Sequence, residues 1–203
     1  MSVDFANSET LKNLMRAFAG ESQARNRYTF AAAQCRAQGL HVLEAVFQFT
    51  AHQEKEHAEI FYRHMKPFAG GTVHIDGGYP VDLTEDPVVL LRRARHGEYQ
   101  EHQEIYPAFA ETARQEGFDR IAASFQLIAA IEQSHGDRFG ALADLLEQGK
   151  LFSGGAGQGW LCLNCGHIHQ GPAAPGACPV CGHNQGFFLR LETAPFGSPG
   201  GVQ

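Results

Sequence analysis

The two C-x-x-C pairs near the C-terminal end limit the fold of this chain more than any other feature. Cys162 and Cys165 form the first pair, Cys178 and Cys181 form the second, and a glycine follows each pair. Two thiolates spaced in this way can grip one metal ion tetrahedrally, and the glycines permit tight turns that aim backbone N–H groups at sulfur. The surrounding residues carry Gly and Pro and show no helical period. Since so small a segment hardly folds without a metal, we predict a small, mainly strand-and-loop metal domain over residues 160–193.

Spacing alone leaves the metal open, because zinc and iron accept the same four thiolates. A pair of disulfides is the weaker alternative. The N-terminal residues show no basic stretch followed by an apolar run, so we expect no secretory signal and a cytoplasmic location, where thiols stay reduced. The fifth cysteine, Cys35, falls in a helical stretch, and we expect it to be a small buried hydrophobe.

Composition argues against two classes of partner. The formal net charge is −6, whereas a nucleic-acid-binding protein usually carries a basic patch. No apolar run approaches the length that a bilayer span requires. We therefore expect neither a nucleic-acid partner nor a membrane partner.

The residues before the metal domain carry apolar side chains at helical spacing. They predict four long helices, over residues 8–38, 40–64, 84–116 and 119–148. Ser8 and Thr84 are the expected N-caps of the first and third. Residues 66–84 read as an irregular connection, long enough to cross the length of a bundle. We predict an all-α four-helix bundle with one long crossover over residues 1–150. A flexible linker is expected at 151–159 and a mobile tail at 194–203.

Two Glu-x-x-His pairs occur in the predicted bundle: Glu54 with His57, and Glu132 with His135. The i, i+3 spacing puts both side chains of a pair on one helix face, where they suit a first-row transition metal. Such pairs also arise by chance, so the two alone are weak evidence. Their location strengthens them, because they fall on the second and fourth helices while the first supplies Glu21 and the third Glu98. This is the ligand set of ferritin-like di-iron bundles.

Glu101 follows Glu98 by one turn and is one carboxylate more than that minimal set. Two divalent irons in a low-dielectric core need about four carboxylates for neutrality. Oxidation adds positive charge, which a further carboxylate that moves onto the metal would offset. The alternative is that Glu98 and Glu101 form a solvated helix face.

Two tyrosines follow the glutamates of the first and third helices by about two turns. Tyr28 lies after Glu21, and Tyr106 lies after Glu98. They are either ordinary core residues or hydrogen-bond donors that orient the carboxylates, and we favour the second interpretation.

Several segments resemble one known family, the rubrerythrins. Residues 17–28, AFAGESQARNRY, look like the first-helix signature of that family, and residues 53–58, QEKEHA, are similar to its second-helix motif. Residues 97–107 and 130–135 resemble the third and fourth helices, and residues 160–191 resemble the rubredoxin-like domain. The resemblance covers nearly the whole chain.

The resemblance implies a ligand role for each matching side chain. Glu54 and Glu132 would bridge the two irons, and one iron would exchange His57 for Glu101 on oxidation. The implied di-iron and catalytic set is Glu21, Glu54, His57, Glu98, Glu101, Glu132 and His135. The four cysteines would hold a single iron, with zinc able to replace it in a recombinant preparation.

The family activity is the reduction of hydrogen peroxide to water. Electrons would come from rubredoxin or an NAD(P)H-dependent reductase and pass through the cysteine-bound iron. The chain carries no nicotinamide or flavin motif, so we expect an external donor. The resemblance also implies a homodimer and leaves open whether helices are exchanged between chains.

Two other functions compete with a peroxidase. A ferroxidase or iron-handling protein would use the same bundle ligands, but it needs no attached one-electron relay. The third hypothesis is a non-enzymatic binding module with a zinc ribbon and a merely structural bundle. Metal content and visible absorption would distinguish this module from the two iron proteins.

Overall fold

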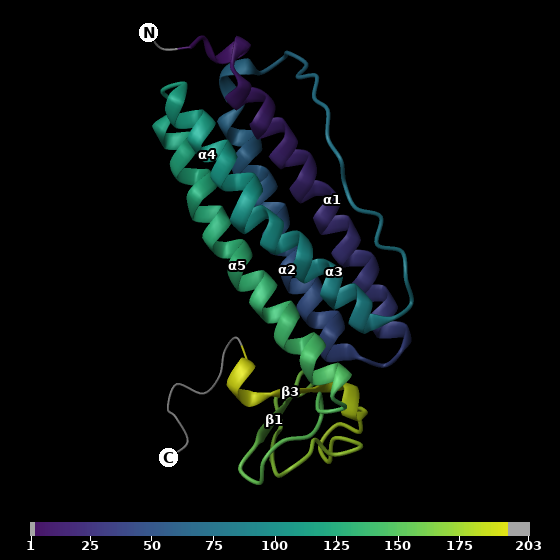
Figure 1. Ribbon diagram of the computed structural model, residues 1–203. Coiled ribbons are helices and arrows are strands. Elements are labelled where there is room, and N and C mark those ends of the chain that lie inside the picture. The colour runs from purple at the N-terminus through teal and green to yellow at the C-terminus, as the bar shows by residue number, and fades with distance from the viewer. Residues whose placement is uncertain (1–2, 195–203) are drawn as a thin grey trace.

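The computed structural model describes residues 3–194, which form a long helical bundle with a small domain at one end (Figure 1). Almost all of the predicted C-terminal tail lies outside the described residues. The helices are α1 (Glu9–Ala37), α2 (His41–His64), α3 (Pro87–Gln100), α4 (Tyr106–Gln115) and α5 (Asp119–Glu147). Within the described part of the chain, no helix has both the length and the apolar character to cross a membrane.

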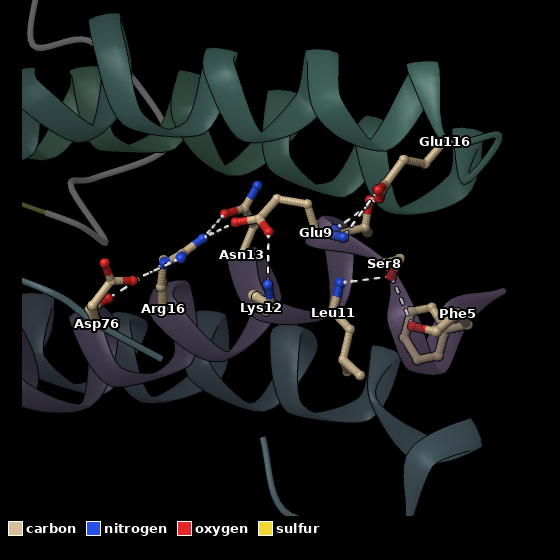
Figure 2. Close-up of polar contacts among 10 residues, drawn as sticks. Phe5, Ser8, Glu9, Leu11, Lys12, Asn13, Arg16, Asp76 and Glu116 are labelled. Atoms are coloured by element: carbon tan, nitrogen blue, oxygen red, sulfur yellow. Dashed lines mark hydrogen bonds and ion pairs between the residues drawn. The ribbon is translucent and has the colours of Figure 1, made fainter. Parts of the chain in front are cut away.

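The N-terminus of α1 is satisfied by two side chains. Ser8 Oγ accepts a hydrogen bond from the Leu11 amide at 3.0 Å, as its predicted role as N-cap requires. The carboxylate of Glu116, from the turn between α4 and α5, accepts from the amides of Glu9 at 2.9 Å and Thr10 at 2.8 Å (Figure 2). A carboxylate there also complements the positive end of the helix dipole. These contacts tie the start of α1 to the opposite hairpin.

The third predicted helix differs from expectation at its start and in its middle. It begins at Pro87, and the N-cap is Asp86, whose carboxylate accepts from the Val88 amide at 2.8 Å; Thr84 was the wrong cap. A π-helical turn at Glu101–Ile105 then separates α3 from α4. Pro107 explains it, because a proline lacks the N–H for the regular ladder and its ring collides with the carbonyl four residues earlier. The wider turn avoids that collision.

The crossover between α2 and α3 runs the length of the bundle beside α1 (Figure 1). Arg16 anchors one end through an ion pair from Nη2 to Asp76 Oδ1 at 2.8 Å (Figure 2). The Tyr79 hydroxyl donates to the Arg16 carbonyl at 3.2 Å. An Arg27–Asp82 ion pair anchors the other end. The crossover makes α1 and α2 one antiparallel hairpin, and α3, α4 and α5 the other.

The bundle core is split into two apolar clusters. One surrounds Phe47 and Phe139 near the small domain, and the other surrounds Phe61 and Phe125 at the far end. Between them lies a belt of buried carboxylates and imidazoles. The split core leaves room for charged side chains in the middle of the bundle.

The small domain holds a three-stranded antiparallel sheet in the order β2-β1-β3. The strands are β1 (Gly159–Cys162), β2 (Ile168–Gln170) and β3 (Phe188–Arg190). It rests on the turn between α1 and α2, where the His41 ring stacks on Phe187 with centroids 3.9 Å apart. A Cβ on Gly186 would lie 1.8 Å from the Gly39 carbonyl oxygen, so only glycine permits this approach.

The segment predicted as a linker, residues 151–159, makes specific contacts in the structure. Leu151 is buried in the bundle cluster around Phe47, and Phe152 packs against both that cluster and the core of the small domain. The Arg190 guanidinium donates to the carbonyls of Lys150 at 2.8 Å and Ser153 at 2.5 Å. The glycine content predicts a flexible linker, whereas in the structure Leu151, Phe152 and Arg190 make contacts that connect the two domains.

Candidate metal centres

Six of the predicted ligands come together in the middle of the bundle. They come from α1, α2, α3 and α5, and each is at most 5% exposed. The six are Glu21, Glu54, His57, Glu98, Glu132 and His135. Charged side chains are almost never buried to this degree unless they are paired or bind a metal.

The six side chains form two groups that share two carboxylates. Glu21, Glu54, His57 and Glu132 make up the first group, and Glu54, Glu98, Glu132 and His135 make up the second. Within each group the ligand atoms all lie within 4.8 Å of one another. Sharing of Glu54 and Glu132 is the arrangement that two bridged metal ions require.

Several ligand atoms of the bundle site have no hydrogen-bond partner in the described part of the chain and are therefore available to bind cations. Six buried atoms of this cluster find no hydrogen-bond partner among the described residues: Glu21 Oε2, Glu54 Oε1, Glu98 Oε2, both carboxylate oxygens of Glu132, and His135 Nδ1. An unpartnered buried polar atom is costly, and so many in one place are rare in a folded protein. Oxygen and imidazole donors in this proportion fit a pair of first-row transition metals.

Burial and close contacts shift the pKa values of the clustered side chains in both directions. Burial and the neighbouring charge of Glu54 raise the pKa of Glu98 to about 8, and burial with repulsion from Glu132 raises that of Glu21 well above its ordinary value. Burial opposes the charge on Glu54, but contacts with His135 and His57 outweigh it and lower its pKa to about 2. Metal binding must displace any proton that a raised pKa retains on these carboxylates.

Both tyrosines reach the cluster from the apolar core. The Tyr28 hydroxyl donates to Glu98 Oε1, and the Tyr106 hydroxyl donates to Glu21 Oε1 at 2.5 Å. Each tyrosine therefore contacts the glutamate of the other hairpin, and not the one that precedes it in sequence. A hydrogen bond of this kind fixes the orientation of a carboxylate.

Glu101, the seventh predicted ligand, is in neither group. It opens the π-helical turn, and its Oε1 lies 3.8 Å from the position that a Cβ of Gly20 would occupy. Gly20 precedes Glu21, so the carboxylate of Glu101 rests beside the group that contains His57.

Two contacts around His135 were not assigned a role from sequence. His135 Nε2 donates to Gln53 Oε1 at 3.0 Å, across the α2–α5 interface. Gly136 lets the Tyr99 ring approach, since a Cβ there would lie 2.7 Å from it, and the Tyr99 hydroxyl donates to Asp137 at 2.5 Å. Gln53 adjoins Glu54 in sequence, but nothing local indicated that it faces a histidine of another helix.

The four cysteines also form one site. Their sulfur atoms lie within 4.8 Å of one another, and the Cys162–Cys181 and Cys165–Cys178 separations are 3.8 and 3.6 Å. A disulfide requires about 2.05 Å, so the disulfide alternative is excluded and all four are free thiols. The set fits one tetrahedral metal ion.

The two cysteine turns have the same backbone design. The amide of Gly166 donates to the Cys162 carbonyl at 2.9 Å, and the amide of Gly182 donates to the Cys178 carbonyl at 2.9 Å. Both glycines adopt positive φ, of 77° and 73°. A hydrogen bond from the His183 backbone lowers the pKa of Cys181 to about 6, which favours the thiolate that binds metal.

Comparison with known proteins agrees over both domains. The family model described as Rubrerythrin matches residues 12–143, and that of its rubredoxin-like domain matches residues 160–188. The rubrerythrin of Clostridium perfringens is 43% identical over 182 residues, which are 89% of this chain and 93% of that protein. The rubrerythrin of Porphyromonas gingivalis is 42% identical over 193 residues, 95% of each chain.

Solved structures of nigerythrin have a similar fold. Its mixed-valence state gives a TM-score of 0.61 at 27% identity, covering 93% of this chain and 91% of that one. Its fully reduced, all-ferrous state gives a TM-score of 0.60 at 28% identity, covering 91% and 90%.

A four-helix bundle with two metal groups that share carboxylates, joined to a four-cysteine domain, defines a ferritin-like metalloprotein with an appended rubredoxin-like domain. This confirms the predicted fold class. The chain belongs to the rubrerythrin family. The donor sets fit the cofactors expected of that family, a di-iron centre in the bundle and a single iron on the four cysteines.

Proposed function

We propose that this protein is a non-haem di-iron peroxidase that reduces hydrogen peroxide to water. In balanced form, one peroxide, two electrons and two protons give two waters. The observation that carries the proposal is the pair of four-ligand groups that share Glu54 and Glu132, with a spare carboxylate, Glu101, beside one of them. A simple ferritin-like pair of sites needs no such spare group.

The ligand roles follow from the two groups. Glu21 and His57 would hold one metal, Glu98 and His135 would hold the other, and the two shared carboxylates would bridge them. An iron pair bound here supplies the two electrons that cleave the O–O bond. The hydroxyls of Tyr28 and Tyr106 keep Glu98 and Glu21 oriented, and the apolar clusters on both sides restrict water.

Glu101 and His57 are proposed as the exchanging ligands. The resemblance assigns His57 to the reduced state and Glu101 to the oxidised state. His57 belongs to the first ligand group and Glu101 lies near Gly20 outside both groups, which supports Glu101 as the carboxylate that enters. An added carboxylate would offset the positive charge gained on oxidation, and that is the physical reason for the exchange.

Electrons are proposed to enter through the cysteine-bound iron from an external donor, either rubredoxin or an NAD(P)H-dependent reductase. Within one chain, His41 touches the small domain and His57 lies about 24 Å further along α2. The cysteine site of a second chain would lie nearer to the bundle site of the first, so we propose a homodimer. Four exposed apolar residues on the neighbouring helices α2 and α5 support a dimer interface on these two helices: Phe49, Ile60, Leu127 and Ile131.

The test is a rapid-mixing experiment on the fully reduced protein. We expect oxidation by hydrogen peroxide to be much faster than oxidation by dioxygen, followed at the visible absorption of the cysteine-bound iron. Faster reaction with dioxygen, or assembly of a hollow multi-subunit shell that stores iron, would instead favour the ferroxidase alternative. Sedimentation of the same sample measures the proposed dimer.

A further inference from the structure

The two histidines of the bundle site are held differently. Each directs Nδ1 at the shared carboxylates: His57 lies 3.0 Å from Glu54 Oε2, and His135 lies 2.8 Å from Glu132 Oε2. The outer nitrogen of His135 donates to Gln53 Oε1 at 3.0 Å. For His57, no residue that the structure describes hydrogen-bonds Nε2. Each imidazole therefore has one hydrogen bond among the described residues, through the outer nitrogen in His135 and through the inner nitrogen in His57.

We propose that Gln53 is a positioning residue that fixes His135 as a permanent ligand and thereby confines ligand exchange to the His57 end. This inference rests on the proposed di-iron function. A neutral imidazole carries one N–H, and an acceptor at Nε2 keeps the hydrogen there and leaves the Nδ1 lone pair for a metal. Gln53 supplies that acceptor.

The position of Gln53 restricts movement of the hydrogen-bonded His135 ring. It lies on α2 directly before the shared Glu54, whereas His135 lies on α5, so the hydrogen bond links two helices from different hairpins. His135 is fully buried, and the Tyr99 ring of α3 packs closely against the α5 backbone at Gly136, the next residue. Rotation of the His135 side chain would break its hydrogen bond to Gln53 and cause collisions with the closely packed side chains around it.

The spare carboxylate lies where exchange remains possible. Glu101 rests against Gly20, next to Glu21, and Glu21 shares a group with His57 but not with His135. The histidine without an outer hydrogen bond and the carboxylate without a metal group are therefore at the same end. The histidine with the outer hydrogen bond, His135, shares its group with Glu98 and not with Glu21.

The experiment uses the full-length protein loaded with Co²⁺ alone, which gives paramagnetically shifted imidazole N–H signals in proton NMR. The cysteine site carries no imidazole ligand and does not interfere. We expect one slowly exchanging N–H, from His135, and one that exchanges quickly, from His57. Gln53→Leu removes the acceptor, Gln53→Ala does so with a smaller side chain, and Gln53→Glu retains one. Gln48→Leu, an exposed change on the same helix, is the matched control.

Gln53→Leu and Gln53→Ala should lose the slow N–H signal and bind Co²⁺ about 10- to 100-fold more weakly at one of the two bundle positions. Gln53→Glu and Gln48→Leu should keep both properties. An unchanged slow signal and unchanged affinity in Gln53→Leu would overturn the proposal. So would equal weakening at both positions with a lower melting temperature of the metal-free protein, since that indicates a merely structural role. Peroxide turnover of the unaltered protein tests the proposed function separately.

Discussion

The two metal sites of this protein are built in opposite ways. The cysteine site comes from two short turns that are close in sequence, and each turn is shaped by its own glycine and backbone amides. The bundle site takes side chains from four helices, and its geometry exists only after two hairpins have packed together. The first site makes its domain fold, whereas the second depends on a fold that the apolar clusters already provide.

Loss of one cysteine ligand should have the largest effect, because the small domain depends on its metal site for folding and the bundle does not. Cys178→Ser should unfold the small domain, because metal binding contributes on the order of 10–16 kcal/mol to the folding of structural sites. Trp160 is the single tryptophan of the chain and is buried in that domain, so its emission should shift to the red. Helical circular dichroism should persist. Cys35→Ala is the control, and unchanged emission in Cys178→Ser would refute the expectation.

Removal of a shared carboxylate should affect both metals of the bundle. Glu54→Gln should lower bundle iron content toward zero and slow the peroxide reaction more than about 100-fold, whereas Glu98→Gln should affect one metal. Elemental analysis and rapid mixing measure the two effects. Glu59→Gln, at a partly exposed position on the same helix outside both ligand groups, serves as the control. Full iron content in Glu54→Gln would show that the carboxylate does not bridge.

A hydrogen bond to one ligand should matter less than the ligand itself. Tyr106→Phe removes the donor to Glu21 and should weaken metal binding about 10-fold, as measured by anaerobic Fe²⁺ titration. The Trp160 emission should not change, because the cysteine domain is independent of this contact. Tyr62→Phe, at a tyrosine that is 59% exposed, is the control. Equal Fe²⁺ affinities of the Tyr106→Phe and Tyr62→Phe variants would show that Tyr106 is only a core residue.

The pH dependence of stability should be the smallest effect. Burial raises the pKa of Glu98 to about 8; for His57, burial favours the neutral form, but hydrogen bonds to Glu132 and Glu54 raise its pKa to about 9. Both groups hold protons in the folded metal-free bundle that the unfolded chain releases at lower pH. The melting temperature of the metal-free protein should therefore fall as pH rises from about 5 to about 9. Bound metal displaces the protons, so the loaded bundle should lack this slope.

The sequence predicts most strongly what depends on neighbours in the chain. The cysteine turns could be read from two glycines, and the helices from apolar spacing. The π-helical turn was missed although Pro107 was visible, because the pattern on either side of it is helical. The domain contacts of Leu151, Phe152 and Arg190 were missed because glycines dominate the composition of the segment.

The bundle site could be predicted as a set of residues but not as a geometry. Glu-x-x-His spacing places two side chains on one face, and four helices supply the remainder. The pairing of each tyrosine with the glutamate of the opposite hairpin depends on how the hairpins pack. The hydrogen bond from His135 to Gln53 has the same origin, since no local pattern records which residues of two distant helices meet.

The crossover beside α1 has a consequence for assembly. Each hairpin brings one glutamate followed by a Glu-x-x-His pair, so each holds half of the donor set. The crossover thus acts as a tether that gives one half-site a high effective concentration around the other. If protease cut it between its anchors at Asp76 and Asp82, metal capture would become an encounter of two fragments, and its strength would depend on protein concentration.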